Sequence, residues 1–128
     1  MNTLANKTLA RVAFGLPFAV FGLNHLLGFR EMAAYVLPGW PLAEVLVIVS
    51  GLAMIAGGVA IVIGKLGVYA SLGIALLMLT FNLTVHLPGI VAAGGDQAKM
   101  MMPMISFLKD TALFGGAVAM AYIFRTEK

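Results

Sequence analysis

The sequence predicts an all-α protein, a four-helix transmembrane bundle built as a single domain of residues 1–128. Hydrophobic residues make up 62% of the chain and charged residues only 10%, whereas about a quarter of the residues in soluble domains are charged. The apolar residues form three long stretches and a fourth that is interrupted by Lys109 and Asp110. Each stretch is close to the roughly 20 residues that a helix needs to cross a bilayer. The lipid bilayer is therefore the first expected partner.

Helices are expected at about 10–27, 41–63, 66–85 and 103–124. The turn at Lys65 is so short that the second and third helices must form a hairpin. Pro41 suits the first turn of the second helix, and Pro88 with Gly89 is expected to end the third. Residues 29–37 are too few to span the bilayer, so we expect them to lie along its outer interface as a short amphipathic helix or turn.

Glycines recur at seven-residue spacing in the first two expected helices. Gly15 and Gly22 lie on one face of the first, and Gly51 and Gly58 lie on one face of the second. Small residues at such positions let two helix backbones approach closely in a membrane. The pattern predicts that these faces serve helix packing.

The basic residues predict the orientation of the bundle. Four spans bring both termini to the same side as the Lys65 turn, and five basic residues lie there: Lys7, Arg11, Lys65, Arg125 and Lys128. The other side has three, which are Arg30, Lys99 and Lys109. The positive-inside rule therefore predicts cytoplasmic termini in a bacterial inner membrane. Because the net charge of +3 is spread over helix ends and loops, no nucleic-acid partner is expected.

Polar residues gather in the outer third of the expected spans. Glu44 and His86 each lie 21 residues from Lys65, or roughly 31 Å along a helix. A charge near the centre of a span costs about 2.5–3.5 kcal/mol on insertion scales. All four helices nevertheless contribute to this level, which gives seven candidate ligand-binding residues: Asn24, His25, Glu44, Asn82, His86, Lys109 and Asp110.

The adjacent charges of the fourth helix need partners inside the bundle. Glu44 lies seven residues from Gly51, and Lys109 lies seven residues from Gly116, so both are expected to face inward. Pairing an inward carboxylate with an inward ammonium lowers the free energy of burying each. We therefore expect an ion pair between Glu44 and Lys109. Asp110 is turned by about 100° from Lys109, and Arg30, a histidine and the following loop all remain possible partners for it.

Four motifs in this order resemble the DoxX family of small four-helix membrane proteins. The first is an arginine that opens the first helix, which ends in glycine-x-x-polar (Arg11, Gly22, His25). The second is a glutamate before a glycine-rich helix (Glu44), and the third is a histidine that closes the third helix (His86). The fourth is a lysine, an acid and a glycine pair in the fourth helix (Lys109, Asp110, Gly115, Gly116). The resemblance covers about residues 9–121. Many members have lysine where this chain has His25, so what holds for that lysine does not transfer.

The resemblance implies a binding or complex-forming role, with no established catalysis by the chain itself. Members of the family are associated with membrane oxidoreductase systems, including a subunit of thiosulfate:quinone oxidoreductase, and with thiol-stress complexes. A eukaryotic relative is an assembly chaperone for receptor channels. Redox-complex subunits are thus expected partners, and a homo-oligomer remains open.

Several functions remain open for the polar residues. One alternative is a structural network that fixes helix register, as in an assembly protein without a ligand. The other is a site for a small hydrophobic molecule such as a quinone, in which a histidine would bond to the carbonyl of the quinone. Haem b bound by His25 and His86 is a further alternative, as is a metal bound by these histidines with Glu44 and Asp110. A methionine run at 100–104 suggests copper(I) but is more typical of packing. The chain has no cysteine, phosphate loop or paired serine nucleophile, so no catalytic residue is assigned.

Overall fold

The computed structural model describes residues 3–127, and over that range it contains helices and turns but no strand. The elements are α1 (Thr3–Leu27), α2 (Phe29–Val36), α3 (Ala43–Ile63), α4 (Gly67–Phe81), the π-helical turn η1 (Asn82–His86), α5 (Leu87–Ala92) and α6 (Gln97–Thr126). α4, η1 and α5 follow one another without a break and form one rod. Within the described range α1, α3, this rod and α6 are long and apolar enough to cross a membrane. The prediction of an all-α protein with four apolar spans is confirmed.

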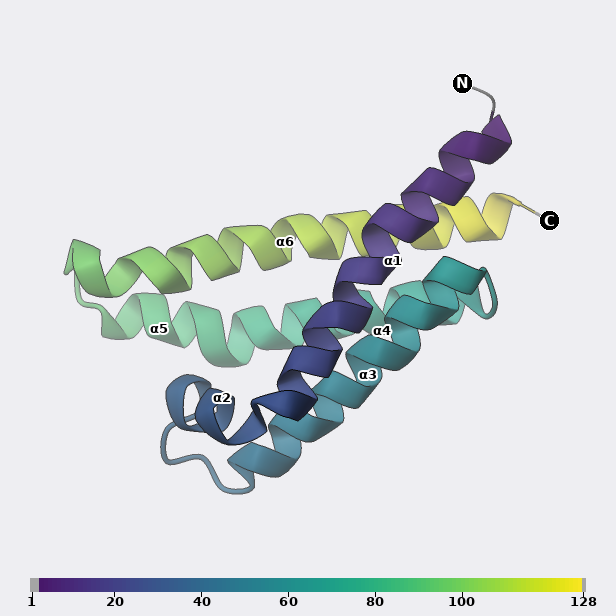
Figure 1. Ribbon diagram of the computed structural model, residues 1–128. Coiled ribbons are helices and arrows are strands. Elements are labelled where there is room, and N and C mark those ends of the chain that lie inside the picture. The colour runs from purple at the N-terminus through teal and green to yellow at the C-terminus, as the bar shows by residue number, and fades with distance from the viewer. Residues whose placement is uncertain (1–2, 128) are drawn as a thin grey trace.

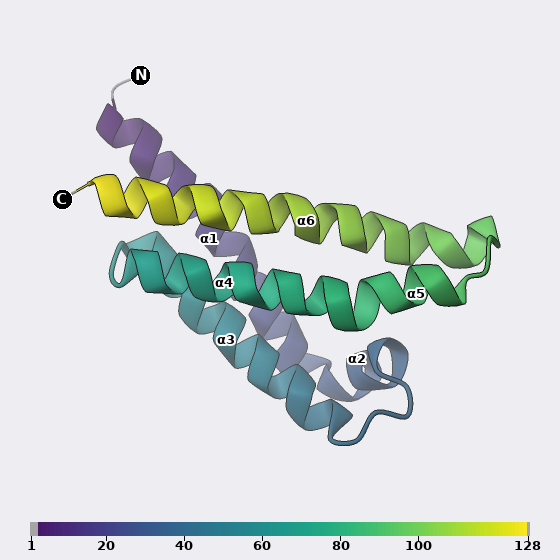
Figure 2. The same ribbon diagram turned by 180° about the vertical axis from the view of Figure 1, so that it is seen from behind.

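The four spans are arranged as two antiparallel pairs, α1 with α3 and the α4–α5 rod with α6. The pairs meet where α1 begins, α6 ends and α3 turns into α4, and they diverge toward the opposite end (Figure 1). The view from behind shows the same divergence, with α2 beside the far end of the α1–α3 pair (Figure 2). We call the first end of the molecule the closed end and the second the open end.

The α1–α3 pair is held together by the two predicted glycine pairs. Gly15 lies against Gly58, where an added Cβ would come within 2.7 Å of the Gly58 carbonyl oxygen. Gly22 lies against Gly51, where a Cβ would come within 2.5 Å of the Gly51 carbonyl oxygen. The prediction that these faces pack is confirmed, because only hydrogen side chains leave room for backbones this close.

The closed end is a packed apolar core with its ionic groups at the rim. Ile61 and Ile74 are almost fully buried there, together with other aliphatic and methionine side chains of α3, α4 and α6. Arg11 Nη2 donates to the Val62 carbonyl oxygen at 3.2 Å, near the C-terminal end of α3. A cation at this position compensates the free carbonyls of a helix C-terminus. Arg11 thus ties α1 to the α3–α4 turn.

Three helix boundaries differ from the sequence-based expectation, and one of them is the start of α1 at Thr3 instead of near residue 10. The third span does not end near residue 85 but continues through Pro88 to Ala92, with Pro88 in the first turn of α5. A π-turn directly before it shifts the hydrogen bonds to residues five apart, so the missing proline N–H does not break the rod. The fourth helix begins at Gln97, because the Asp96 carboxylate caps it by accepting from the N–H of Ala98 at 3.0 Å.

Candidate functional site: a cavity between the helix pairs

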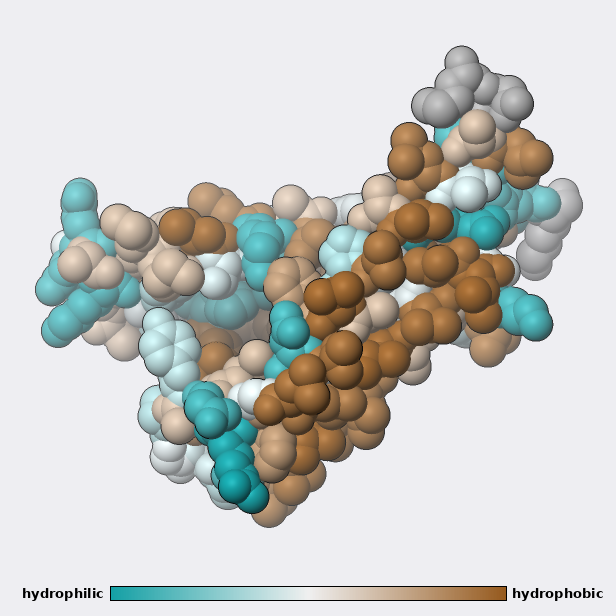
Figure 3. Space-filling model, viewed as in Figure 1, coloured by the Kyte–Doolittle hydropathy of each residue, from teal (hydrophilic) through white to brown (hydrophobic). Residues whose placement is uncertain are grey.

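A cavity of about 210 Å³ lies between the two helix pairs toward the open end. Its wall is mainly apolar: Phe18, Phe21, Met32, Val36, Leu37, Val47, Met54, Met78, Phe81, Val85 and Leu113. Five polar residues complete the lining: His25, Ser50, His86, Lys109 and Asp110. The surface is hollowed between the limb that contains α6 and the limb that contains α1 and α3 (Figure 3). An apolar cavity with a few polar groups is the usual form of a small-molecule site.

The rod changes its hydrogen bonding where it reaches this cavity. In η1 the N–H of Leu87 donates to the carbonyl of Asn82, five residues earlier. Such π-turns are rare and are found frequently at functional sites. The wider turn still leaves Asn82 and His86 facing α6, where they contact the neighbouring residues Thr111 and Asp110.

Asp110 is the most deeply buried charged residue of the cavity wall, with 3% of its surface exposed. His86 Nε2 donates to Asp110 Oδ2 at 2.9 Å, and Lys109 Nζ lies 3.4 Å from Asp110 Oδ1. Each carboxylate oxygen therefore has its own partner. Burial of an unpaired carboxylate is strongly unfavourable, and these two partners offset that penalty.

Lys109 extends from this buried pair toward the surface. Its side chain is 53% exposed. The ammonium lies 5.4 Å from the centre of the Phe21 ring, over the face of an aromatic side chain on the other helix pair. An ammonium in this position is attracted by the ring quadrupole. Lys109 thus bridges α6 and α1 at the cavity.

Asn82 and Thr111 form a second polar contact beside the cavity. The Thr111 hydroxyl donates to the Phe107 carbonyl oxygen at 2.7 Å. Because its hydrogen is used there, the hydroxyl oxygen accepts from Asn82 Nδ2 at 3.0 Å. Asn82 Oδ1 is buried and has no hydrogen-bond partner among residues 3–127. The Asn82 amide is therefore fixed in one orientation, in which its oxygen accepts no hydrogen bond from these residues.

His25 enters the cavity from α1. Its Nδ1 atom lies 2.7 Å from the carbonyl oxygen of Phe21, one turn earlier in the same helix. Its Cβ atom packs against Gly51, where an added methyl group would come within 2.7 Å. The second glycine pair therefore also fixes the position of this histidine.

A family model for DoxX matches residues 7–87 of the chain. This segment includes most of α1 and all of α2, α3, α4 and η1, and it is more than half of the 128 residues. The chain belongs to the DoxX family. With its four apolar helices it is an integral, multi-pass membrane protein. Comparisons with curated proteins and with solved structures found no match.

The DoxX match includes all of the cavity lining except the part that lies on α6. His25 and His86 lie inside the matched segment, whereas Lys109 and Asp110 lie beyond it on α6. The lysine, acid and glycine features of the fourth helix thus remain a resemblance noticed in the sequence. The geometry joins the two parts, because Asp110 bonds directly to His86.

The ion pair expected between Glu44 and Lys109 is not formed. Lys109 is paired with Asp110, and Glu44 is exposed without a hydrogen bond or ion pair to any residue in 3–127. Glu44 follows the glycine face of α3 as expected, but α1 ends at Leu27 and no longer covers that face at this height. Of the three partners considered for Asp110, the structure shows a histidine, which is His86.

Four of the seven candidate residues line the cavity and three do not. His25, His86, Lys109 and Asp110 belong to the lining, whereas Asn24 and Glu44 are exposed and Asn82 lies behind it. The sequence interpretation missed the contribution of α2, which covers the cavity with Met32 and Val36. The amphipathic pattern of residues 29–37 predicted a short helix or a turn, and the structure has a helix, α2, but the pattern did not reveal which face turns inward.

The cavity does not fit the haem and metal alternatives. A cavity of about 150 Å³ is enough to hold benzene, so 210 Å³ matches one substituted ring and not a four-ring porphyrin. His86 Nε2 is also already bonded to Asp110. Over residues 3–127, no group of three or more histidine, cysteine or acidic side chains is arranged to hold a metal ion.

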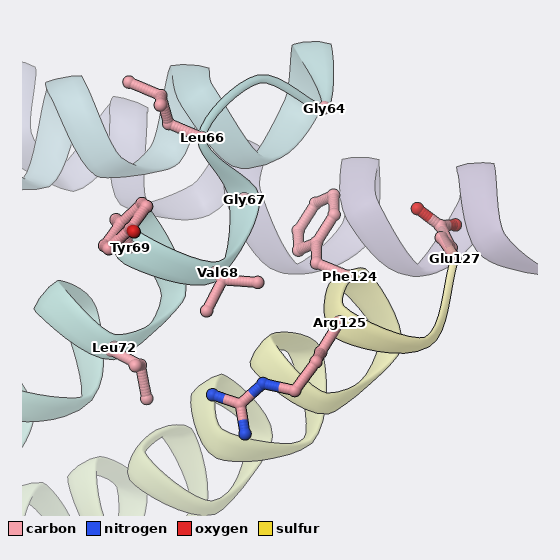
Figure 4. A pocket seen from close by; sticks show the side chains of 9 residues that line it. All are labelled: Gly64, Leu66, Gly67, Val68, Tyr69, Leu72, Phe124, Arg125 and Glu127. Atoms are coloured by element: carbon pink, nitrogen blue, oxygen red, sulfur yellow. The ribbon is translucent and has the colours of Figure 1, made fainter.

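A second hollow at the closed end has a different character. It is lined by the α3–α4 turn, the start of α4 and the end of α6 (Figure 4). The Phe124 ring lies directly on Gly67, where no Cβ fits. Arg125 extends along α6 and away from Glu127, so the two charges do not converge on a common point (Figure 4). This hollow is a groove beside a packing contact.

Proposed function

We propose that this DoxX protein binds a small hydrophobic ligand, such as a quinone, in the cavity between its helix pairs. The chain then acts as a non-catalytic binding protein or as the membrane subunit of a redox complex. The observation that carries the proposal is the chain of contacts from His86 through the buried Asp110 to Lys109, on the wall of an apolar cavity. Buried charges in a membrane span are expensive and are usually functional.

The cavity chemistry suits a ligand with an apolar body and at least one oxygen. Lys109 offers N–H donors to a carbonyl, and Phe18, Phe81 and the methionines surround a ring. The Asp110 carboxylate links the His86 imidazole to the Lys109 ammonium. The proposed ligand-binding residues are therefore His25, His86, Lys109 and Asp110.

The test of binding uses protein purified in a mild detergent from its own membranes. Organic extraction followed by mass spectrometry should yield about one equivalent of a lipid-soluble ring compound. The double variant His86→Leu with Asp110→Leu should yield much less, while native mass spectrometry of the unextracted protein reports any partner chain or second copy. Wild-type protein that folds but carries no compound, and binds no added quinone, contradicts the proposal.

We further propose that the cavity opens toward the periplasm of a bacterial inner membrane, with both termini in the cytoplasm. The excess of basic residues at the closed end supports this orientation through the positive-inside rule. Since the chain has no cysteine, single cysteines are clean reporters. An impermeant maleimide should label Gly95→Cys in intact spheroplasts, and it should label Thr126→Cys only after lysis. The reverse pattern contradicts the orientation.

A structural role without a ligand is the second candidate. The observation that favours it is the complete pairing of Asp110, whose two oxygens both have protein partners. Replacing a buried ionic group by apolar residues of similar volume is often neutral or stabilising. On this alternative, the triple variant His86→Leu, Lys109→Met, Asp110→Leu folds at least as stably as the wild type and supports the same cellular function. Loss of function in a well-folded triple variant favours the ligand site.

A further inference from the structure

We infer that the cavity selects an aromatic ring that carries a hydroxyl group, in preference to one that carries only carbonyl or ether oxygens. The inference rests on the proposed function, since it specifies which ligand class the same cavity takes. It follows from the hydrogen-bonding roles of His25 and Lys109.

The partner of His25 fixes which ring nitrogen carries the hydrogen. A backbone carbonyl only accepts hydrogen bonds, so the contact of 2.7 Å to the Phe21 oxygen requires a hydrogen on Nδ1. In the neutral imidazole the other nitrogen, Nε2, is then a bare acceptor. No residue in 3–127 hydrogen-bonds to it, and His25 lines the cavity. The cavity wall on α1 therefore provides a hydrogen-bond acceptor.

Lys109 provides a donor in the lining of the same cavity. Its ammonium has three N–H groups, and the contact with Asp110 uses one of them. Phe21 connects the two groups, because its carbonyl holds the His25 ring and its own ring lies under the Lys109 ammonium. An acceptor on α1 and a donor on α6 thus flank the same residue at the cavity.

One phenolic hydroxyl satisfies both groups at once. Its hydrogen is donated to His25 Nε2, and its oxygen accepts from Lys109. A quinone carbonyl or an ether oxygen accepts from Lys109 but leaves the lone pair of His25 facing another lone pair. A site built for a hydroxyl discriminates against an analogue that lacks it, since its own polar group is then left unpaired. The surrounding phenylalanine and methionine side chains suit the ring itself.

The test compares two redox-inert probes of similar shape, 4-octylphenol and 4-octylanisole. Their binding to the protein in lipid nanodiscs is measured by calorimetry and corrected with empty nanodiscs. We expect the phenol to bind about tenfold more tightly than the anisole, which corresponds to one unpaired hydrogen-bonding group. His25→Leu should remove this preference, His25→Gln should retain most of it through its amide oxygen, and Lys109→Met should weaken both probes.

The outcomes separate this inference from the proposed function. Equal binding of both probes, or a preference that survives in His25→Leu, overturns the selection of a hydroxyl while ligand binding stands. Binding of neither probe overturns the inference and also removes support from the proposed function. A second measurement covers the case in which His25→Leu does not fold. The ¹⁵N shifts of the wild-type imidazoles should show His25 with its hydrogen on Nδ1, and the opposite tautomer overturns the inference.

Discussion

The two helix pairs are packed differently at the closed end and at the open end of this protein. At the closed end the two helix pairs meet, and aliphatic side chains such as Ile61 and Ile74 fill the space between them. At the open end the pairs diverge, and the space holds a cavity with an ionic chain on its wall. The same four helices thus provide a rigid anchor at one end and room for another molecule at the other.

The difference indicates where stability and function reside. Close backbone packing at the glycine pairs holds α1 against α3 along one helix pair. The ionic chain of His86, Asp110 and Lys109 lies in the region between the diverging pairs. Substitutions in the glycine contacts should therefore affect folding, and substitutions in the cavity should mainly affect binding.

The largest effect is expected from Gly22→Leu in the α1–α3 contact. A leucine here collides with the Gly51 backbone and with Ile55, so the two helices must separate. Overpacking typically costs about 1–3 kcal/mol and sometimes more, and we expect at least the upper end of that range. Unfolding in detergent, followed by circular dichroism, measures the loss. Gly73→Leu is the matched control, because a Cβ at that glycine meets no atom within 4 Å.

A smaller effect is expected from Lys109→Met at the cavity. The change leaves the buried Asp110 carboxylate with only the His86 imidazole beside it, and we expect a loss of about 1–3 kcal/mol in unfolding free energy. The double variant Lys109→Met with Asp110→Leu should recover most of that loss, because it also removes the buried charge. A double variant less stable than the single one contradicts the pairing seen here.

Thr111→Val should have an effect of about 1 kcal/mol or slightly more, since it leaves the buried Asn82 amide without its acceptor. Thr111→Ser retains the hydroxyl and should behave like the wild type. Adding Asn82→Leu to Thr111→Val should restore stability. The same unfolding measurement decides all three, and equal stability of the valine and serine variants would show that the amide contact contributes nothing.

Much of the fold follows from patterns that a sequence carries locally. The four apolar stretches set the helices, and the seven-residue spacing of Gly15, Gly22, Gly51 and Gly58 set the contact face of one helix pair. These predictions depend only on periodicity and span length. They hold because each concerns one helix or two helices joined by a short chain.

The pairing inside the site depends on information that no local pattern contains. Glu44 and Lys109 were expected at neighbouring heights, but they belong to different helix pairs, and Lys109 pairs with Asp110 on its own helix. Asp110 contacts His86, which lies in the π-turn directly before Pro88. The sequence suggested instead that this proline ends the helix. A helix that continues through proline needs such an adjustment, so Pro88 was the one available signal.

The most direct test of the central claim fills the cavity. Ser50→Phe places a ring in the cavity lining, and Thr80→Phe places the same ring at an exposed position outside it. Both native hydroxyls donate to a carbonyl of their own helix, so the two substitutions remove equivalent contacts. The measurement is the amount of lipid-soluble compound that co-purifies with each folded variant. We predict retention in Thr80→Phe and loss in Ser50→Phe, and equal amounts in the two would contradict a ligand site between the helix pairs.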